Sequence, residues 1–274
     1  MSSDVHRPGD IRSILTYTGH VADHNDRGVA GARLVGRMLS ERLGLPQAIV
    51  TDDAASCKEG WRADLSLALH GLFQLRAAHH DLLAAPGRTL VTLPRCSSAL
   101  ATLPNLAVAH PDALVVWLDA HADLNTPAST CTGYLGGMVL SAGVGWWESG
   151  LGAGLAADNV ILGGSRDFDP FERNLVDEGV IKLAAGETWL DDLDGYLGDR
   201  PVYIHLDCDV LEPGIVPTEY EVPDGWSLDD LRAAAERLAA NPVLGVEIAE
   251  LEVEDDDTPA AVAALLDALA PVLT

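Results

Sequence analysis

The stretch Val115-Val116-Trp117-Leu118-Asp119-Ala120-His121-Ala122-Asp123-Leu124-Asn125 decides the fold and contains the first candidate site. Its four leading residues are apolar and predict a buried strand. After them, Asp119, His121 and Asp123 alternate with small residues, and side chains two positions apart in an extended chain point to the same side. Buried carboxylates of one sign need a counter-ion. The pattern therefore predicts a divalent metal ion at the end of this strand.

A second acidic pair follows another apolar run, since Asp207 and Asp209 come directly after residues 202–206 (VYIHL). A single Asp-x-Asp at a strand end is more often a turn or a helix cap than a metal site. The two clusters together supply four carboxylates and one imidazole. Without a metal ion, backbone groups and water would have to satisfy all of them, which is costly for buried charges. We therefore favour one shared metal site.

The order of apolar runs and helical patterns predicts the fold. We expect strands at 11–17, 48–50, 88–93, 112–118, 159–163, 202–206 and 243–248, and helices at 28–43, 61–85, from near Ser97, 227–240 and 259–269. Continuous apolar strands that alternate with helices are typical of a parallel sheet covered on both faces. No linker or internal repeat interrupts the pattern. We therefore predict an α/β fold, a single-domain three-layer α/β/α structure spanning residues 1–274.

Polar clusters gather where this fold binds its ligands. In such sheets the site lies beyond the carboxyl ends of the strands. Each cluster in the sequence follows a predicted strand: Cys96, Asp119 to Asp123, Asp169, Asp207 to Asp209, and Glu250. This agreement between fold and chemistry places the candidate site at one edge of the sheet.

The amino-acid composition restricts the classes of partner and substrate that we expect. The formal charge is −25, from 42 acidic and 17 basic residues, which disfavours nucleic acid and anionic membranes as partners and favours a cationic substrate. No apolar run reaches the ~18 residues of a membrane helix, and Met1 to Pro8 lack the pattern of a signal peptide. The four cysteines are widely spaced, which predicts reduced thiols in a cytoplasmic protein: Cys57, Cys96, Cys131 and Cys208.

Three histidines outside the acidic clusters receive structural interpretations. His79 and His80 lie on the long predicted helix, where we expect them at the surface. His205 lies within the strand that leads to Asp207, and we expect it to be packed in the core.

The two acidic motifs, DAHAD at 119–123 and HLDCDVLEP at 205–213, resemble those of the ureohydrolase family, which includes arginase, agmatinase and formiminoglutamase. The resemblance runs from Arg88 to the end of the chain, with the motifs in the family's order. It implies a mainly parallel eight-stranded sheet. It also implies two Mn²⁺ ions that hold a bridging hydroxide, which attacks a guanidinium carbon.

The resemblance assigns metal ligands residue by residue. Asp119 and Asp207 match the carboxylates that bridge the two metal ions. His121 and Asp209 match the remaining ligands of one ion. Asp123 matches a ligand of the other ion and would also accept a hydrogen bond from the hydroxide.

The resemblance also implies a substrate site. Glu250 matches the glutamate that pairs with the substrate guanidinium, and Asn125 and Thr132 match residues that hold an α-carboxylate. Asp169 and Glu172 match acidic residues near the α-amino group. Both ends of an amino acid are thus represented, which favours an arginine-like substrate over a decarboxylated amine.

Cys96 is the first departure from the family pattern. The family has Gly-Gly-Asp-His before the first acidic motif, and that histidine is a metal ligand; here the stretch is Leu93-Pro94-Arg95-Cys96. A thiolate is a competent but softer ligand, better suited to zinc than to manganese. Cys96 could instead be a small buried apolar residue that leaves this metal weakly held. The surrounding CSSALATLP and TGYLGGMVL resemble the branch that carries cysteine here, which includes a hydroxyarginine hydrolase of cycloserine biosynthesis.

Gly136 is the second departure, since arginases have a histidine in this loop that shuttles protons or contacts substrate. The role cannot be carried over. We expect the smaller residue to leave room for a bulkier or N-substituted guanidine.

These features predict a manganese-dependent amidinohydrolase that cleaves a guanidino C–N bond in arginine or Nω-hydroxyarginine. Asp123 and Glu250 would be its catalytic residues, acting on the nucleophile and the guanidinium. One alternative is a formiminoglutamate or other guanidino-acid hydrolase. Another, motivated by the two missing histidines, is a degenerate non-catalytic protein that binds a ligand or a partner subunit. The sequence leaves a homo-oligomer possible.

Overall fold

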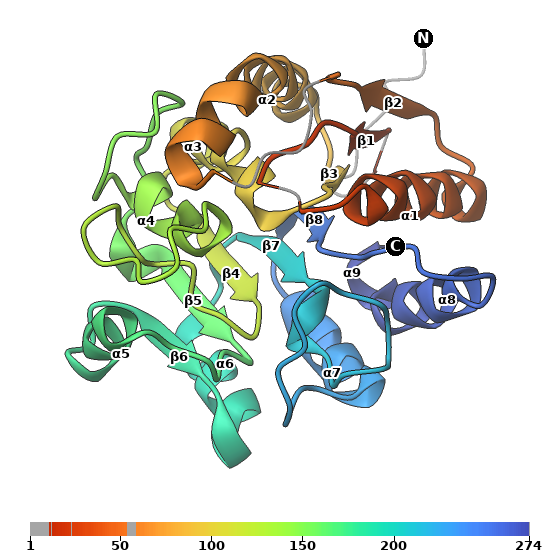
Figure 1. Cartoon of the computed structure of the whole chain (residues 1–274). Helices are drawn as coiled ribbons and strands as arrows, with labels where there is room; N and C mark the ends of the chain where they lie inside the picture. The colour runs from red at the N-terminus through yellow and green to blue at the C-terminus, as the bar shows by residue number, and fades with distance from the viewer. Residues whose placement is uncertain (1–10, 12, 23, 54–58, 274) are drawn as a thin grey trace, which may run out of the picture.

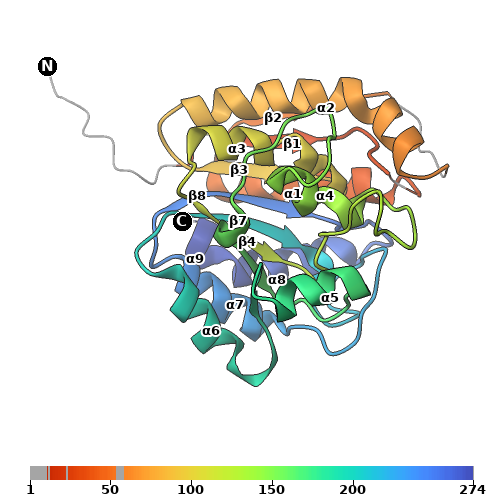
Figure 2. The same ribbon diagram turned by 90° about the vertical axis from the view of Figure 1, so that its left-hand side faces the viewer.

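The computed structural model describes residues 11, 13–22, 24–53 and 59–273. It contains one sheet with helices on both faces (Figures 1 and 2). In chain order the strands and α-helices are β1 (Ile14–Tyr17), α1 (Arg27–Leu43), β2 (Gln47–Val50), α2 (Trp61–Ala84), β3 (Thr89–Thr92), α3 (Leu103–Ala109), β4 (Leu114–Leu118), α4 (Val139–Val144), β5 (Val160–Gly163), α5 (Pro170–Asp177), β6 (Lys182–Ala184), α6 (Trp189–Leu197), β7 (Val202–Asp207), α7 (Leu228–Leu238), β8 (Val243–Ala249), α8 (Thr258–Ala268) and α9 (Ala270–Leu273).

The sheet has eight strands in the order β2-β1-β3-β8-β7-β4-β5-β6, and every pair of neighbours is parallel. The predicted α/β class and parallel sheet are confirmed. The chain switches direction across the sheet between β3 and β4, so that β8 and β7 lie between them. A ligand site in such a sheet lies at the carboxyl ends of the strands, where the strand order switches.

Two clusters of buried apolar side chains hold the layers together. One cluster includes residues of α1, α6, α7, α8 and α9 on one face of the sheet. The other includes residues of α2, α3 and α4 on the opposite face, and Figures 1 and 2 show the same division. The central strand β4 is buried along its whole length. Removing this apolar surface from water is the main favourable term in folding.

The predicted elements match the structure apart from their ends, but the strand β6 and the helices α4, α5, α6 and α9 were not predicted. The strand expected at 11–17 begins at Ile14, and the helix expected near Ser97 begins as a 3₁₀ turn at Cys96–Leu100 before α3. The edge strand β6 has only three residues and is partly exposed. It therefore carries no apolar run of the kind that identified the other strands.

His79 lies in the core, so the prediction that it would be at the surface is wrong. It is fully buried on the inner side of α2, with its Nε2 atom 3.3 Å from the Tyr203 hydroxyl. Burial in this apolar layer lowers the pKa of His79 from 6.5 to about 4, although the charge of Glu247 opposes the shift. Its neighbour His80 is exposed, as predicted.

The neutral His79 ring should make folding sensitive to acid. Below pH 6.5 the unfolded chain binds a proton that the folded chain excludes until about pH 4. Stability is therefore fully present above pH 6.5 and is lost as the pH falls toward 4. Urea unfolding should show wild-type protein losing about 2 kcal/mol more than His79→Gln between pH 7.5 and pH 5. Parallel losses in the two proteins would contradict this account.

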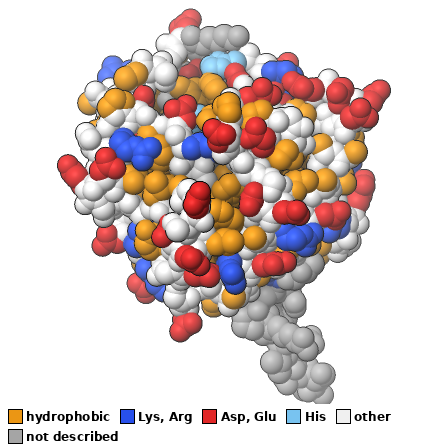
Figure 3. All heavy atoms as spheres, turned by 90° about the horizontal axis from the view of Figure 1, so that it is seen from below, with side chains coloured by type: hydrophobic (Ala, Val, Ile, Leu, Met, Phe, Trp, Pro, Cys, Tyr) orange, Lys and Arg blue, Asp and Glu red, His pale blue; other side chains and the backbone are white. Residues whose placement is uncertain are grey.

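The surface shown in Figure 3 carries many acidic side chains interspersed with basic and apolar ones, in keeping with the net charge of −25. Within the described ranges, no helix is long and apolar enough to cross a membrane. Cys96, Cys131 and Cys208 are free thiols. Cys57 and the segment Met1 to Pro8 lie outside the described residues.

Candidate metal centre and substrate pocket

The candidate residues meet at the ends of four adjacent central strands. Cys96 follows β3, Asp119 to Asp123 follow β4, Asp207 ends β7, and Glu250 follows β8. These strands are neighbours in the order β3-β8-β7-β4. Residues separated by more than a hundred positions in sequence are therefore brought to one edge of the sheet.

A pocket of about 280 Å³ opens at this edge. Its walls include ten of the eleven predicted site residues: Cys96, His121, Asp123, Asn125, Thr132, Asp169, Glu172, Asp207, Asp209 and Glu250. The remaining one, Asp119, is fully buried next to them. The walls also include residues that were not predicted as site residues, namely Thr130, Tyr134, Gly136, Gly137, Asp167 and Tyr220.

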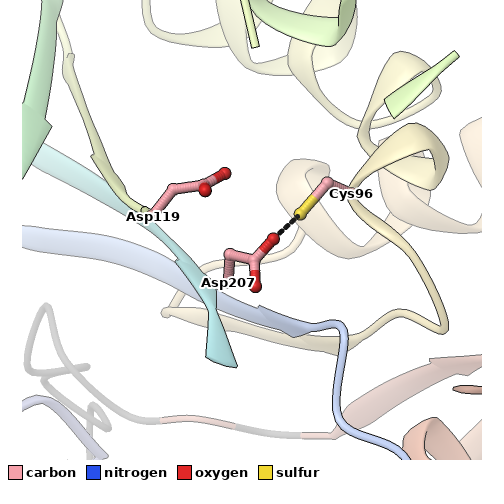
Figure 4. A group of neighbouring side chains, drawn as sticks. All are labelled: Cys96, Asp119 and Asp207. Atoms are coloured by element: carbon pink, nitrogen blue, oxygen red, sulfur yellow. Dashed lines mark hydrogen bonds between the residues drawn. The ribbon is translucent and has the colours of Figure 1, made fainter. Parts of the chain in front are cut away.

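Two overlapping sets of ligand atoms lie close enough to hold metal ions. In each set the candidate atoms lie within 4.8 Å of one another. The sets are Cys96, Asp119, Asp207 and Asp119, His121, Asp209. Figure 4 shows the first set converging from three segments, with the Cys96 Sγ atom 3.0 Å from Asp207 Oδ2. Because Asp119 belongs to both sets, the arrangement suits two neighbouring cations that share a carboxylate.

The charge balance of these groups also favours cations. The His121 Nδ1 atom lies 3.0 Å from Asp209 and 3.4 Å from Asp119. Burial alone would lower the pKa of His121, but its bonds to the two carboxylates outweigh burial and raise the pKa to about 12. Burial, followed by the charges of neighbouring carboxylates, raises the pKa of Asp207 well above its usual range. Several carboxylates thus share the single positive charge of His121. Divalent metal ions would neutralise the remaining negative charge.

Asp123 has an unusual conformation beside these sets. Its φ angle is +53°, and its Oδ2 atom is buried without a hydrogen-bond partner in the described part of the chain. Burial and the charge of Asp119 raise its pKa well above the usual range. Glu250 has a φ angle of +63°. Such strained backbone is found where a site requires a particular side-chain direction. The buried acceptor atom of Asp123 fits a metal ion or a hydrogen-bond donor in the pocket.

Cys96 is held by a chain of buried polar groups that the sequence did not reveal. Its Sγ atom lies 3.0 Å from His205 Nε2, and His205 Nδ1 lies 2.7 Å from Glu247 Oε1. The His205 ring also stacks on Trp117, with ring centroids 3.5 Å apart. Burial, then the charge of Asp207, raises the pKa of the Cys96 thiol. His205 is packed in the core as predicted, and it also fixes the direction of the Cys96 side chain.

The residues of the predicted amino-acid subsite form hydrogen bonds with one another and with neighbouring residues. Asn125 donates to Asp169 at 2.8 Å and accepts from the Ser129 hydroxyl at 3.0 Å. Glu172 accepts from the backbone N–H groups of Leu124 and Asp169, at 2.9 and 3.0 Å. Glu172 therefore positions the segment after Asp123 and caps α5, in addition to lining the pocket. Thr132 lies at the exposed rim, where it accepts from the Tyr134 backbone N–H.

The space beside Gly136 is taken by an aromatic ring. A Cβ atom at position 136 would lie 2.4 Å from a ring carbon of Tyr134. The expectation that Gly136 leaves room for a larger guanidine is therefore wrong for this side of the pocket. Tyr134 also lies beside Tyr220, with ring centroids 5.6 Å apart, and Tyr220 lies 5.9 Å from the His121 ring. Neither tyrosine was predicted as a site residue, although Tyr134 lies within the stretch TGYLGGMVL.

Comparison with known proteins identifies the family. The chain belongs to the arginase family, whose model matches residues 73–270. It is 42% identical over 261 residues to N(omega)-hydroxy-L-arginine amidinohydrolase from Streptomyces lavendulae, which covers 94% of this chain and 96% of that protein.

More distant similarities are found both in sequence and in structure. Arginase-1 from Sus scrofa is 30% identical over 200 residues, which cover 63% of this chain and 61% of that protein. Among solved structures, arginase from Bacillus cereus superimposes with a TM-score of 0.80 at 22% identity and covers 94% of this chain and 96% of its own. Proclavaminate amidino hydrolase from Streptomyces clavuligerus gives 0.71 at 17% identity, covering 97% and 92%.

Proposed function

We propose that this protein is a manganese-dependent amidinohydrolase that cleaves a guanidino C–N bond in an arginine-like amino acid, with Nω-hydroxyarginine as its preferred substrate. The observation that carries the proposal is the pair of ligand sets that share Asp119 at the base of the pocket. Family membership supports the reaction type. The substrate named for the 42% identical relative supports the hydroxylated guanidine.

The ligand sets and the family resemblance together suggest which residues would hold the ions. Asp119, which belongs to both sets, and Asp207 would be shared by the two ions. His121 and Asp209 would complete one site, and Cys96 and Asp123 would complete the other. Such a pair of divalent ions lowers the pKa of bound water and so supplies a nucleophile at neutral pH. Oxygen ligands suit Mn²⁺, while the thiol of Cys96 makes the second site the softer one.

Side chains of the pocket would perform the remaining steps. Asp123 would accept a hydrogen bond from the attacking water and pass a proton to the leaving amine. Glu250 would orient the guanidino group. Asn125, Thr132 and Asp169 would bind the α-carboxylate and α-amino ends. The products would be ornithine with urea, or ornithine with hydroxyurea when the substrate is hydroxylated.

Two other functions fit fewer observations. A formiminoglutamate or other guanidino-acid hydrolase would use the same metal site but has no support from the 42% identical relative. A non-catalytic binding protein would have no need to retain both complete ligand sets and Glu250 in one pocket. We further propose that residues 1–274 act as one cytoplasmic domain, which the free thiols of Cys96, Cys131 and Cys208 support. A homo-oligomer stays a prediction.

Steady-state kinetics test this proposal. The protein is loaded with Mn²⁺, and kcat/KM is measured for arginine and Nω-hydroxyarginine by following urea, hydroxyurea and ornithine. We expect hydroxyarginine to be preferred by about tenfold or more, within the range that one recognised polar group can produce. A chelated sample should show no turnover and recover with Mn²⁺. A clear preference for arginine, or for formiminoglutamate with release of formamide, would overturn the proposal.

A further inference from the structure

Arg95 is a buried cation directly behind the pocket. It stands where the family pattern has an acidic residue, and its side chain is fully buried. Its guanidinium lies 2.8 Å from Glu250 Oε2, 2.6 Å from Glu252 Oε1 and 2.8 Å from Glu219 Oε2. Arg95 thus forms an internal guanidinium–carboxylate pair with Glu250, the residue that would receive the substrate guanidinium.

The fold is built to hold this arginine. Gly28 of α1 lies against it, since a Cβ atom there would lie 3.1 Å from the Arg95 guanidinium carbon and 2.9 Å from the Pro94 carbonyl oxygen. Glu252 is anchored on its other side by Arg27, at 2.8 Å. A side chain fixed by packing and by several carboxylates loses little freedom on forming each bond. Arg95 is therefore a permanent part of the wall behind Glu250.

Both carboxylate oxygens of Glu250 already accept hydrogen bonds from the protein. Its Oε2 atom accepts from Arg95, and its Oε1 atom accepts from the Cys96 backbone N–H at 2.7 Å. A carboxylate has about four lone-pair positions, so further hydrogen bonds remain possible. Arg95, however, already offsets part of the negative charge of Glu250, although it also pairs with Glu219 and Glu252. Glu250 can still accept hydrogen bonds from a guanidine, but its attraction for a second full positive charge is reduced.

From this arrangement we infer that Arg95 is a specificity-determining residue that disfavours fully cationic guanidinium groups and favours less basic ones. The inference rests on the proposed function. Arginine carries a permanent positive charge, whereas hydroxylation of the guanidino nitrogen lowers its basicity. Because the Arg95 side chain is fully buried, its charge is weakly screened and repels a like charge on the substrate. A hydroxyguanidine avoids part of this repulsion and keeps its hydrogen bonds to Glu250.

The test compares ligands of the same shape and different charge. L-Citrulline carries a neutral ureido group where L-arginine carries its guanidinium. Binding of each to Mn²⁺-loaded protein is measured by calorimetry, and kcat/KM is measured for arginine and hydroxyarginine. The variants are Arg95→Lys, which keeps the charge, and the double variant Arg95→Gln with Glu252→Gln, which removes one charge of each sign and so leaves the net charge of the cluster unchanged. Arg27→Met is the matched control, because it removes a half-exposed arginine from the same Glu252 without a contact to Glu250.

The inference predicts that two ratios change, namely the affinity for arginine relative to citrulline and the kcat/KM for hydroxyarginine relative to arginine. In the double variant, the affinity ratio of arginine to citrulline should rise on the order of tenfold, and the preference for hydroxyarginine should fall by a similar factor. Arg95→Lys and Arg27→Met should keep the wild-type ratios. A double variant whose rates fall equally for both substrates, with an unchanged affinity ratio, would show that Arg95 only cross-links the structure. Wild-type protein without turnover, whose affinity ratio still responds to Arg95, would overturn the proposed function and leave this inference standing.

Discussion

Asp123→Asn should lower kcat by about 10²–10⁴-fold, the range associated with loss of a general acid or base. The substitution keeps the size of the side chain but removes the charge and the proton-accepting oxygen. Asp123 has a strained backbone and a buried oxygen without a hydrogen-bond partner in the described residues. Such a group is better explained by a role in the reaction than by a role in folding. Single-turnover rates at saturating substrate would measure the loss.

The matched control for Asp123 is Asp191→Asn, the same substitution at an exposed carboxylate on α6. It should leave kcat within about twofold of wild type, since surface substitutions away from a site have small effects. Thermal unfolding should show Asp123→Asn to be folded. An Asp123→Asn enzyme with near wild-type kcat would rule out the assigned role.

Cys96→Ala should weaken binding of one of the two metal ions by at least about 10–100-fold, the loss expected even for a residue that only supports a ligand. The structure places the Cys96 thiol with Asp119 and Asp207, while the second set, around His121, does not include it. The variant should therefore retain about one ion per chain after dialysis. Cys96→His should retain two and hold Mn²⁺ more firmly, because imidazole is the harder ligand. Elemental analysis would give the metal content.

Cys208→Ala serves as the control for this substitution. Cys208 is also a buried cysteine, but its side chain packs in the apolar cluster on the opposite face of the sheet. It should keep both ions at wild-type affinity. Two firmly held ions in Cys96→Ala would mean that Cys96 is a small buried apolar residue, the alternative that its sequence environment leaves open.

Strong local patterns in the sequence were sufficient to predict the α/β fold and to assign the candidate site residues to one edge of the sheet. The apolar run before Asp119 identifies the central strand. The acidic residues that follow β4 and end β7 mark the edge of the sheet where the candidate ligands lie. Alternation and strand ends are local properties, so they can be read without coordinates. The edge strand β6 was not predicted because it has only three residues, two of them partly exposed, and so leaves no such pattern.

The rest of the site depends on contacts between distant segments. The burial of His79 follows from which face of α2 meets the sheet, and the Tyr134 ring reaches Gly136 through the fold of a loop. The contact between Cys96 and His205 joins residues 109 positions apart. The pair of Arg95 and Glu250 joins residues 155 positions apart. No spacing rule connects such residues, and their chemistry appears only once the strands are side by side.

Anomalous X-ray diffraction from crystals of the Mn²⁺-loaded protein tests the central claim most directly. The account predicts two anomalous peaks at the base of the pocket, both adjacent to Asp119. One should lie at bonding distance from the Cys96 sulfur, roughly 2.3–2.5 Å by comparison with other metal–thiolate bonds. A single peak beside His121, or no peak between Asp119 and Asp207, would contradict a two-ion centre in this protein.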